Sequence, residues 1–255
     1  MKEGATKEAV SEDPAKLFEP REFAGEGGNV LKYRLLKPLG YNPNKIYPLV
    51  IFLHGAGERG DDNAAQLMHG MSEFCKQARR EKNPCYVIAP QCPTGEKWAD
   101  IDWSAEGAVK MPAQASSSLK LTLAVVDAML EDAPIDKNRI YITGLSMGGY
   151  GTWDAIARRP AFFAAAVPIC GGGDPATAEK IKHIAVSCFH GDDDKAVAVE
   201  KSRIIIKAIK EAGGSPLYTE YPGVGHDSWT QTYSSDAMQD WLFAQRRTQT
   251  KPESK

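Results

Sequence analysis

One short junction, residues 139–158, constrains the fold of this 255-residue chain more than any other feature. An apolar stretch, RIYIT, runs into GLSMG (144–148), and a helix-favouring stretch follows directly. Glycines two residues either side of Ser146 allow a sharp turn where bulkier side chains would clash with the neighbouring strand and helix. With 23 glycines in the chain, composition alone gives on the order of 0.1 such matches. The junction therefore predicts a strained strand-to-helix turn that presents the Ser146 hydroxyl.

Strand-like and helix-like segments alternate from residue 47 onward. The stretch 47–53 (YPLVIFL) is apolar throughout, which is typical of a parallel strand buried on both faces. Strands are also expected at 31–36, 85–89, 139–144, 163–169, 185–189 and 217–221, and helices at 61–80, 116–132, 147–158, 199–212 and 234–245. The alternation predicts one doubly wound α/β domain, a mostly parallel sheet covered by helices on both faces. Together with the serine turn it predicts the α/β-hydrolase fold.

The two ends of the sequence lack this periodicity. Residues 1–19 and 246–255 are rich in charges, so we expect flexible segments around a single domain at 20–245. No apolar run approaches the roughly 20 residues that a membrane span needs, so we expect no membrane partner. The net charge of -2 provides no basic field for a nucleic acid. The first 20 residues show no signal-peptide pattern, which suits a cytoplasmic protein or a secreted one whose signal has been removed.

The five cysteines do not indicate a metal site. They form no CxxC pair, and Cys170 and Cys188 lie in apolar runs, where a free thiol behaves as a small buried hydrophobe. Whether Cys85 and Cys92 are bridged stays open at this stage. No cofactor and no metal are expected.

A serine nucleophile needs a histidine to accept its proton, and in this fold the order is serine, acid, histidine. Three histidines follow Ser146. His183 lies in a polar patch typical of a surface, and His190 ends a strand, which suits a packing role. His226 lies in a glycine-rich loop between the last expected strand and the last helix. We therefore predict His226 as the base.

The acid that orients this base should follow the preceding strand. There the sequence offers Asp192, Asp193 and Asp194 in a row. Three adjacent acids are also compatible with a helix cap or a bound cation, although one short turn supplies few oxygen ligands. The chemistry of the residues alone does not separate the three.

Acyl transfer also needs donors aimed at the developing oxyanion. The backbone N–H of Met147, which follows the nucleophile, is one candidate, and the loop HGAGERG (54–60) supplies the other. Within that loop we predict the N–H of Ala56 in preference to that of Gly55. An ordinary glycine-rich turn is the alternative. Glu58 and Arg59 are expected to form an internal ion pair that shapes the loop.

Five motifs in this order carry a resemblance to a known family: LHGAGERGDDN, APQCP, TGLSMGGYGTW, HGDDDKAV and GVGHDSW. The chain resembles bacterial α/β-hydrolase esterases, described as predicted peptidases or phospholipase/carboxylesterases and related to feruloyl-esterase and polyhydroxybutyrate-depolymerase-like hydrolases. The resemblance covers residues 20–245 and implies a Ser–Asp–His triad. The family pattern HGxxDxxV falls on residues 190–197 and selects Asp194 as the acid. The proline that usually follows is Ala198 here, a minor departure.

The expected substrate is a small-molecule or polymer-attached ester. Only about a dozen residues separate the strands at 163–169 and 185–189, so we expect no large lid domain. Trp98 and Trp103 are the candidates for a variable cleft wall that stacks on a sugar or a phenolic acyl group; the alternative is that both pack the loop down. A serine carboxylesterase is the leading hypothesis. A thioesterase, a small serine peptidase and a non-catalytic hydrolase-fold binding protein are the alternatives, and the oligomeric state is left open.

Overall fold

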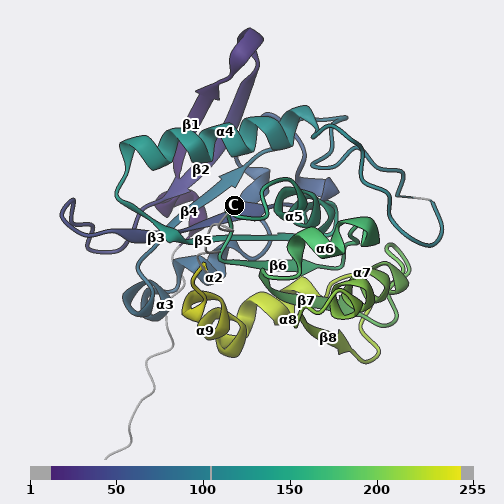
Figure 1. Cartoon of the computed structure of the whole chain (residues 1–255). Helices are drawn as coiled ribbons and strands as arrows, with labels where there is room; N and C mark the ends of the chain where they lie inside the picture. The colour runs from purple at the N-terminus through teal and green to yellow at the C-terminus, as the bar shows by residue number, and fades with distance from the viewer. Residues whose placement is uncertain (1–12, 104, 248–255) are drawn as a thin grey trace, which may run out of the picture.

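The computed structural model describes residues 13–103 and 105–247 (Figure 1). Within these residues the centre is an eight-stranded sheet with the order β1-β2-β4-β3-β5-β6-β7-β8. The strands are β1 (Glu19–Ala24), β2 (Val30–Leu36), β3 (Tyr47–Leu53), β4 (Tyr86–Pro90), β5 (Ile135–Leu145), β6 (Ala165–Ile169), β7 (Ala185–Gly191) and β8 (Leu217–Tyr221). Strands β3 to β8 pair in parallel, and β1 and β2 are antiparallel additions at one edge. The predicted α/β-hydrolase fold is confirmed.

Helices cover both faces of this sheet. They are α1 (Pro14–Leu17), α2 (Met71–Cys75), α3 (Gln77–Lys82), α4 (Ser117–Asp132), α5 (Met147–Arg158), α6 (Ala178–Ile181), α7 (Glu200–Glu211), α8 (Trp229–Ser234) and α9 (Asp236–Ala244). Apolar side chains of α4 to α7 pack with Leu49 and Ile51 of β3, whereas those of α2, α8 and α9 pack with Val50 and Phe52. In Figure 1, α4 and α9 accordingly lie on opposite sides of the sheet. Strand β3 is buried along its whole length because alternate residues enter the two cores.

One expected helix is broken, and another starts later than predicted. The predicted helix at 61–80 is replaced by a 3-10 turn, η3 (Ala65–Leu67), and by α2 and α3. Gly70 has a φ of 76°, a left-handed conformation that cannot continue a helix. The predicted helix at 234–245 is also wrong at its start, because α8 ends at Ser234 and Ser235 caps a new helix, α9.

The N-terminal boundary is also corrected. Within the segment expected to be flexible, residues 14–17 form α1 and Glu19 begins β1. Phe18 is 1% exposed and packs in the core shared with α2 and α9, so burial of this ring holds the segment against the domain. Residues 1–12 and 248–255 lie outside the described residues.

The link between β6 and β7 contains only a 3-10 turn, η4 (Pro175–Thr177), and the short helix α6. It therefore contains no large lid domain, as predicted. None of the described helices has the length and the apolar character that would let it cross a membrane. All five cysteines are free and buried, so Cys85 and Cys92 are not bridged.

Candidate active site

Ser146 lies at the end of β5, directly before α5, in a strained backbone conformation. Its φ of 52° and ψ of -115° are unusual for a residue with a side chain. A β-carbon on Gly148 would lie 1.9 Å from the Leu53 carbonyl oxygen, and one on Gly144 would lie 2.4 Å from the Gly148 oxygen. The two glycines therefore permit the close strand and helix contacts that fix the turn. The Ser146 amide donates to the Ile169 carbonyl at 2.9 Å, which anchors the turn to β6.

The loop after β8 brings His226 to this serine from 80 residues away. The Ser146 hydroxyl donates to His226 Nε2 at 2.9 Å, and His226 Nδ1–H donates to Asp194 Oδ2 at 2.7 Å. The His226 ring is 28% exposed, whereas the Asp194 side chain is fully buried. The three predicted side chains thus form one continuous hydrogen-bonded chain from β5, the β8–α8 loop and the β7–α7 loop.

The three adjacent aspartates have different environments. Asp194 Oδ1 accepts from the amides of Ala196 and Val197 at 2.8 and 2.9 Å, in addition to the histidine contact on Oδ2. Asp192 instead accepts from the Gly223 amide at 2.7 Å, and Asp193 pairs with Lys195 at the surface. Asp194 is therefore the aspartate that the turn directs inward.

A second histidine contacts the same carboxylate oxygen. His190 Nε2 lies 3.2 Å from Asp194 Oδ2 and 3.0 Å from the Val197 carbonyl oxygen, and both side chains of the pair are fully buried. Because Nε2 faces two acceptors, it carries a proton. Burial alone would raise the pKa of Asp194, but hydrogen bonds from His190, His226 and the Val197 amide outweigh burial and hold that pKa below its usual range. The aspartate is therefore ionised at neutral pH.

The loop after β3 forms a 3-10 turn, η2 (Ala56–Glu58), and its preceding residue, Gly55, lies beside Ser146. His54 Nδ1–H donates to the Gly55 carbonyl at 2.6 Å, and the Arg59 guanidinium donates to the Ala56 carbonyl at 2.8 Å. In a trans peptide the C=O and the following N–H point in opposite directions. Because the Gly55 carbonyl accepts from the His54 ring, the Ala56 N–H points away from that ring. Among the described residues, the amides of Ala56 and Met147 donate to no other protein group. Both predicted donors are thus available.

The sequence did not indicate how His54 is used. It is 1% exposed, and its Nε2 accepts from the Cys92 amide at 2.9 Å. Burial lowers the pKa of His54 to about 4, partly opposed by the bond to Gly55. The ring is therefore neutral at pH 7, with one nitrogen donating and the other accepting.

The expected ion pair between Glu58 and Arg59 is wrong. Glu58 Oε1 instead lies 3.5 Å from His69 Nε2, because Arg59 is directed to backbone carbonyls and faces the Trp103 ring. The two side chains leave the 3-10 turn in different directions.

The expectation that Trp98 lines a cleft is also wrong. Its ring is fully buried, packs edge-on against His54 and donates from Nε1 to the His54 carbonyl at 3.0 Å. It supports the loop that carries Ala56 by packing against His54. Trp103 is only partly buried, and the Lys97 ammonium lies 4.6 Å from its ring centroid, so its contact with substrate stays a prediction.

One group of potential metal ligands occurs among the described residues, and it overlaps the hydrogen-bonded chain. Ligand atoms of Cys170, Asp194 and His226 lie within 4.8 Å of one another. The aspartate and the histidine already bond each other, and burial raises the pKa of the Cys170 thiol, which disfavours the thiolate that binds metals. These atoms therefore suit proton transfer better than metal binding.

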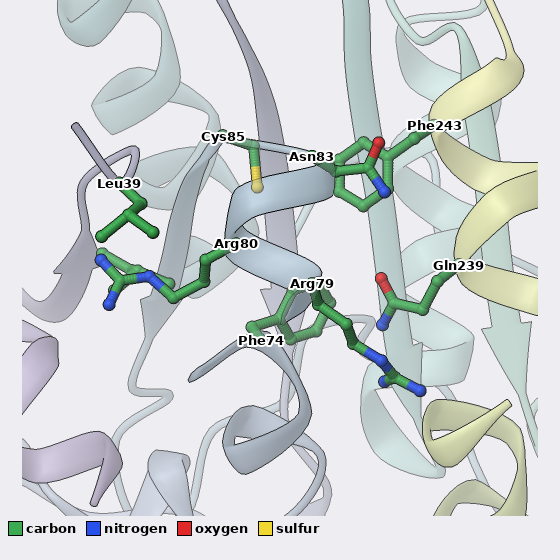
Figure 2. Close-up of a pocket in the computed structure, with 9 residues that line it drawn as sticks. Leu39, Phe74, Arg79, Arg80, Asn83, Cys85, Gln239 and Phe243 are labelled. Carbon is green, nitrogen blue, oxygen red and sulfur yellow. The ribbon is translucent and has the colours of Figure 1, made fainter. Parts of the chain in front are cut away.

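A separate cavity lies at the other end of the sheet (Figure 2). It occupies about 10 Å³ between α3, the start of β4 and α9, with Cys85, Arg80 and Phe243 in its wall. Such a volume holds one water molecule at most. Because Cys85 precedes β4 whereas Ser146 follows β5, this cavity is not part of the site.

Comparison with known proteins agrees with the geometry. A model of the phospholipase/carboxylesterase family matches residues 42–241. A crystal structure of a thermostable esterase is 43% identical, covers 91% of this chain and superimposes with a TM-score of 0.85. Poly(3-hydroxyalkanoate) depolymerase C of Paucimonas lemoignei is 31% identical over 61% of the chain.

An uncharacterized secreted protein of Arthroderma benhamiae is 27% identical over 84% of the chain. The matched segments cover only part of each of these relatives. The chain spans 25% of the Arthroderma protein, 34% of the depolymerase and 64% of the esterase chain.

Proposed function

Because this chain belongs to the phospholipase/carboxylesterase family, we propose that it is a serine carboxylesterase whose nucleophile is Ser146. His226 acts as the general base and then as the general acid. Asp194 orients the imidazole and stabilises its protonated form. The amides of Ala56 and Met147 bind the oxyanion. The observation that carries the proposal is the hydrogen-bonded chain from the Ser146 hydroxyl through His226 to an ionised Asp194.

The reaction proceeds through an acyl-enzyme. His226 Nε2 takes the Ser146 proton as the oxygen attacks the ester carbonyl, and the resulting oxyanion accepts from the two amides. The tetrahedral intermediate collapses, the C–O bond to the alcohol breaks, and His226 returns the proton to the departing alcohol. Water, deprotonated by His226, then attacks the acyl carbon. The bond from that carbon to the Ser146 oxygen breaks, the acid is released, and His226 returns the proton to Ser146. Asp194 stays ionised throughout.

The substrates are small-molecule or polymer-attached esters, with carbohydrate-linked and phenolic acyl esters as the candidates. The short β6–β7 link supports this choice, since no large lid between these strands encloses the substrate. The depolymerase relative is named for a polymeric ester, which is compatible with an accessible site. The net charge of -2 argues against nucleic-acid partners.

A fluorophosphonate probe and p-nitrophenyl acetate test the proposal directly. We expect the wild-type protein to be labelled and to hydrolyse the ester, and the variant Ser146→Ala to lose both, with a fall in kcat of at least about 10³-fold. Absence of labelling and turnover in the wild type would support a non-catalytic binding protein. A parallel panel of thioesters and short peptides separates the esterase from a thioesterase or a peptidase.

A further inference from the structure

Glu58 is a buried carboxylate to which the proposed mechanism assigns no role. Its side chain is 8% exposed, and its one ion-pairing neighbour among the described residues is His69, whose Nε2 lies 3.5 Å from Glu58 Oε1. That distance is too long for a good hydrogen bond. Within the described part of the chain, no protein group donates a hydrogen bond to the Glu58 carboxylate. Neither oxygen of this carboxylate is among the fully buried polar atoms that lack a partner, so the group reaches the surface and can accept a hydrogen bond from a bound molecule.

The Glu58 carboxylate lies beside the nucleophile. A β-carbon placed on Gly55 would lie 2.8 Å from Leu145 Cδ1, 3.0 Å from Glu58 Oε2 and 3.8 Å from Ser146 Cβ, so the carboxylate and the serine both lie beside Gly55. Glu58 also belongs to the turn whose first residue, Ala56, is the proposed oxyanion donor. A group bound to Glu58 is therefore close to the scissile ester.

Aromatic contacts connect Glu58 back to the base. The His69 ring packs against Trp229 with centroids 5.5 Å apart, and Trp229 packs edge-on against His226 at 5.3 Å. The side chains of Ser146, His226, Trp229, His69 and Glu58 thus follow one another around one side of the site. His69 is 35% exposed and Trp229 is partly buried, so a solute can reach this wall.

The polar atoms of this wall identify the kind of ligand. Among the described residues, the Glu58 carboxylate has only the long contact with His69 as a polar side-chain contact, and the Trp229 Nε1–H is a buried donor that lacks an acceptor. A hydroxyl group both donates and accepts, whereas an ammonium group only donates and a carboxylate would be repelled by Glu58. The indole face adds an apolar surface suited to the carbon skeleton of a ring.

We propose that Glu58, His69 and Trp229 form a subsite for a hydroxyl group adjacent to the scissile ester. The preferred substrates are then esters of polyhydroxylated ring alcohols, which is the sugar class. This inference rests on the esterase function proposed above, and it assigns the unpaired carboxylate to substrate selection and not to proton transfer.

Two acetates that differ by one hydroxyl test the subsite. The monoacetate of trans-1,2-cyclohexanediol carries the neighbouring hydroxyl, and cyclohexyl acetate lacks it. We expect the ratio of their kcat/KM values to be about 10 or more in the wild type and to fall at least about fivefold in Glu58→Gln. His69→Phe keeps a ring against Trp229 but removes the nitrogens, and it should lower the same ratio. His183→Gln, an exposed histidine bonded to the Pro160 carbonyl, is the matched control.

The rate of fluorophosphonate labelling shows whether each variant keeps an intact nucleophile. A wild-type ratio near 1, or an equal loss of both esters in Glu58→Gln, would overturn the subsite and leave the esterase proposal in place. Preference for trans-2-(dimethylamino)cyclohexyl acetate over the hydroxy ester would also overturn it, in favour of a cation site. Failure of the wild type to turn over any ester would contradict the esterase proposal itself.

Discussion

Two acidic side chains flank the site, and they differ in how completely the protein satisfies them. Asp194 accepts two backbone amides on one oxygen and contacts two histidines with the other. Glu58, nearly as buried, has one ion-pair contact within the described part of the chain, at 3.5 Å with His69. The protein fixes the first carboxylate before any substrate arrives and leaves the second to be completed by a ligand. A charge that must stabilise an imidazolium during the reaction benefits from such preorganisation, whereas one that selects a substrate must remain available.

Replacing the satisfied carboxylate should have the largest effect. Asp194→Asn keeps the size of the side chain but removes the charge, and its amide can stabilise the wrong tautomer of His226. We expect kcat for p-nitrophenyl acetate to fall by about 10³- to 10⁴-fold. A loss below about tenfold would show that another group orients the base. Glu58→Gln should instead change the ranking of esters, which separates the two roles.

Acid pH should lower the free energy of unfolding, because His54, which stabilises the loop that carries Glu58, becomes protonated. The folded-state pKa of His54 is about 4, below its ordinary value of 6.5, so the neutral ring favours folding. This contribution is fully present above about pH 6.5 and is lost as the pH falls towards 4. At about 1.4 kcal/mol per pH unit it amounts to about 3 kcal/mol of unfolding free energy.

Urea denaturation between pH 7 and pH 4 measures the effect. In His54→Asn, which keeps a side-chain donor near the Gly55 carbonyl, this part of the pH dependence should disappear. An unchanged slope in the variant would assign the acid sensitivity to other groups.

Most of the central fold could be predicted from the sequence. The stretch 47–53 and the segments 147–158 and 217–221 coincide with β3, α5 and β8, because strong apolar patterns and clear breakers bound them. Strand β1 was missed, since it is an edge strand with mostly exposed polar residues and no alternating pattern. The helix break at Gly70 depends on a left-handed backbone conformation, which a glycine allows but does not require.

The three hydrogen-bonded side chains of the candidate site could be predicted from the sequence, but most of the residues around them could not. Ser146, His226 and Asp194 follow from a turn motif, chain order and a family pattern. The contacts of Glu58, His69 and Trp229 join three separate loops, so no local spacing indicates them. The wrong assignment of Trp98 has the same cause. From the sequence alone, a tryptophan in a loop is compatible both with a cleft wall and with a buried core position.

Removing one of the contacts that hold Asp194 should lower the activity by an intermediate amount. His190→Gln removes one of the two histidine contacts on Oδ2. The carboxylate then holds the imidazole of His226 less firmly, so the base is aligned with Ser146 for less of the time. We expect kcat for p-nitrophenyl acetate to fall about tenfold. An unchanged kcat would show that the remaining contacts of Asp194 are enough to orient the base.

The smallest effect is expected at the neighbouring aspartate. Asp192 bonds the Gly223 amide at the surface and does not contact His226, so Asp192→Asn removes a charge but leaves the oriented base in place. An exposed charge several residues from the reacting atoms is screened by solvent and salt. We expect kcat/KM for p-nitrophenyl acetate to change by less than about twofold. Measured beside Asp194→Asn, equal losses would show that the turn as a whole, and not the inward-facing carboxylate, supports the base.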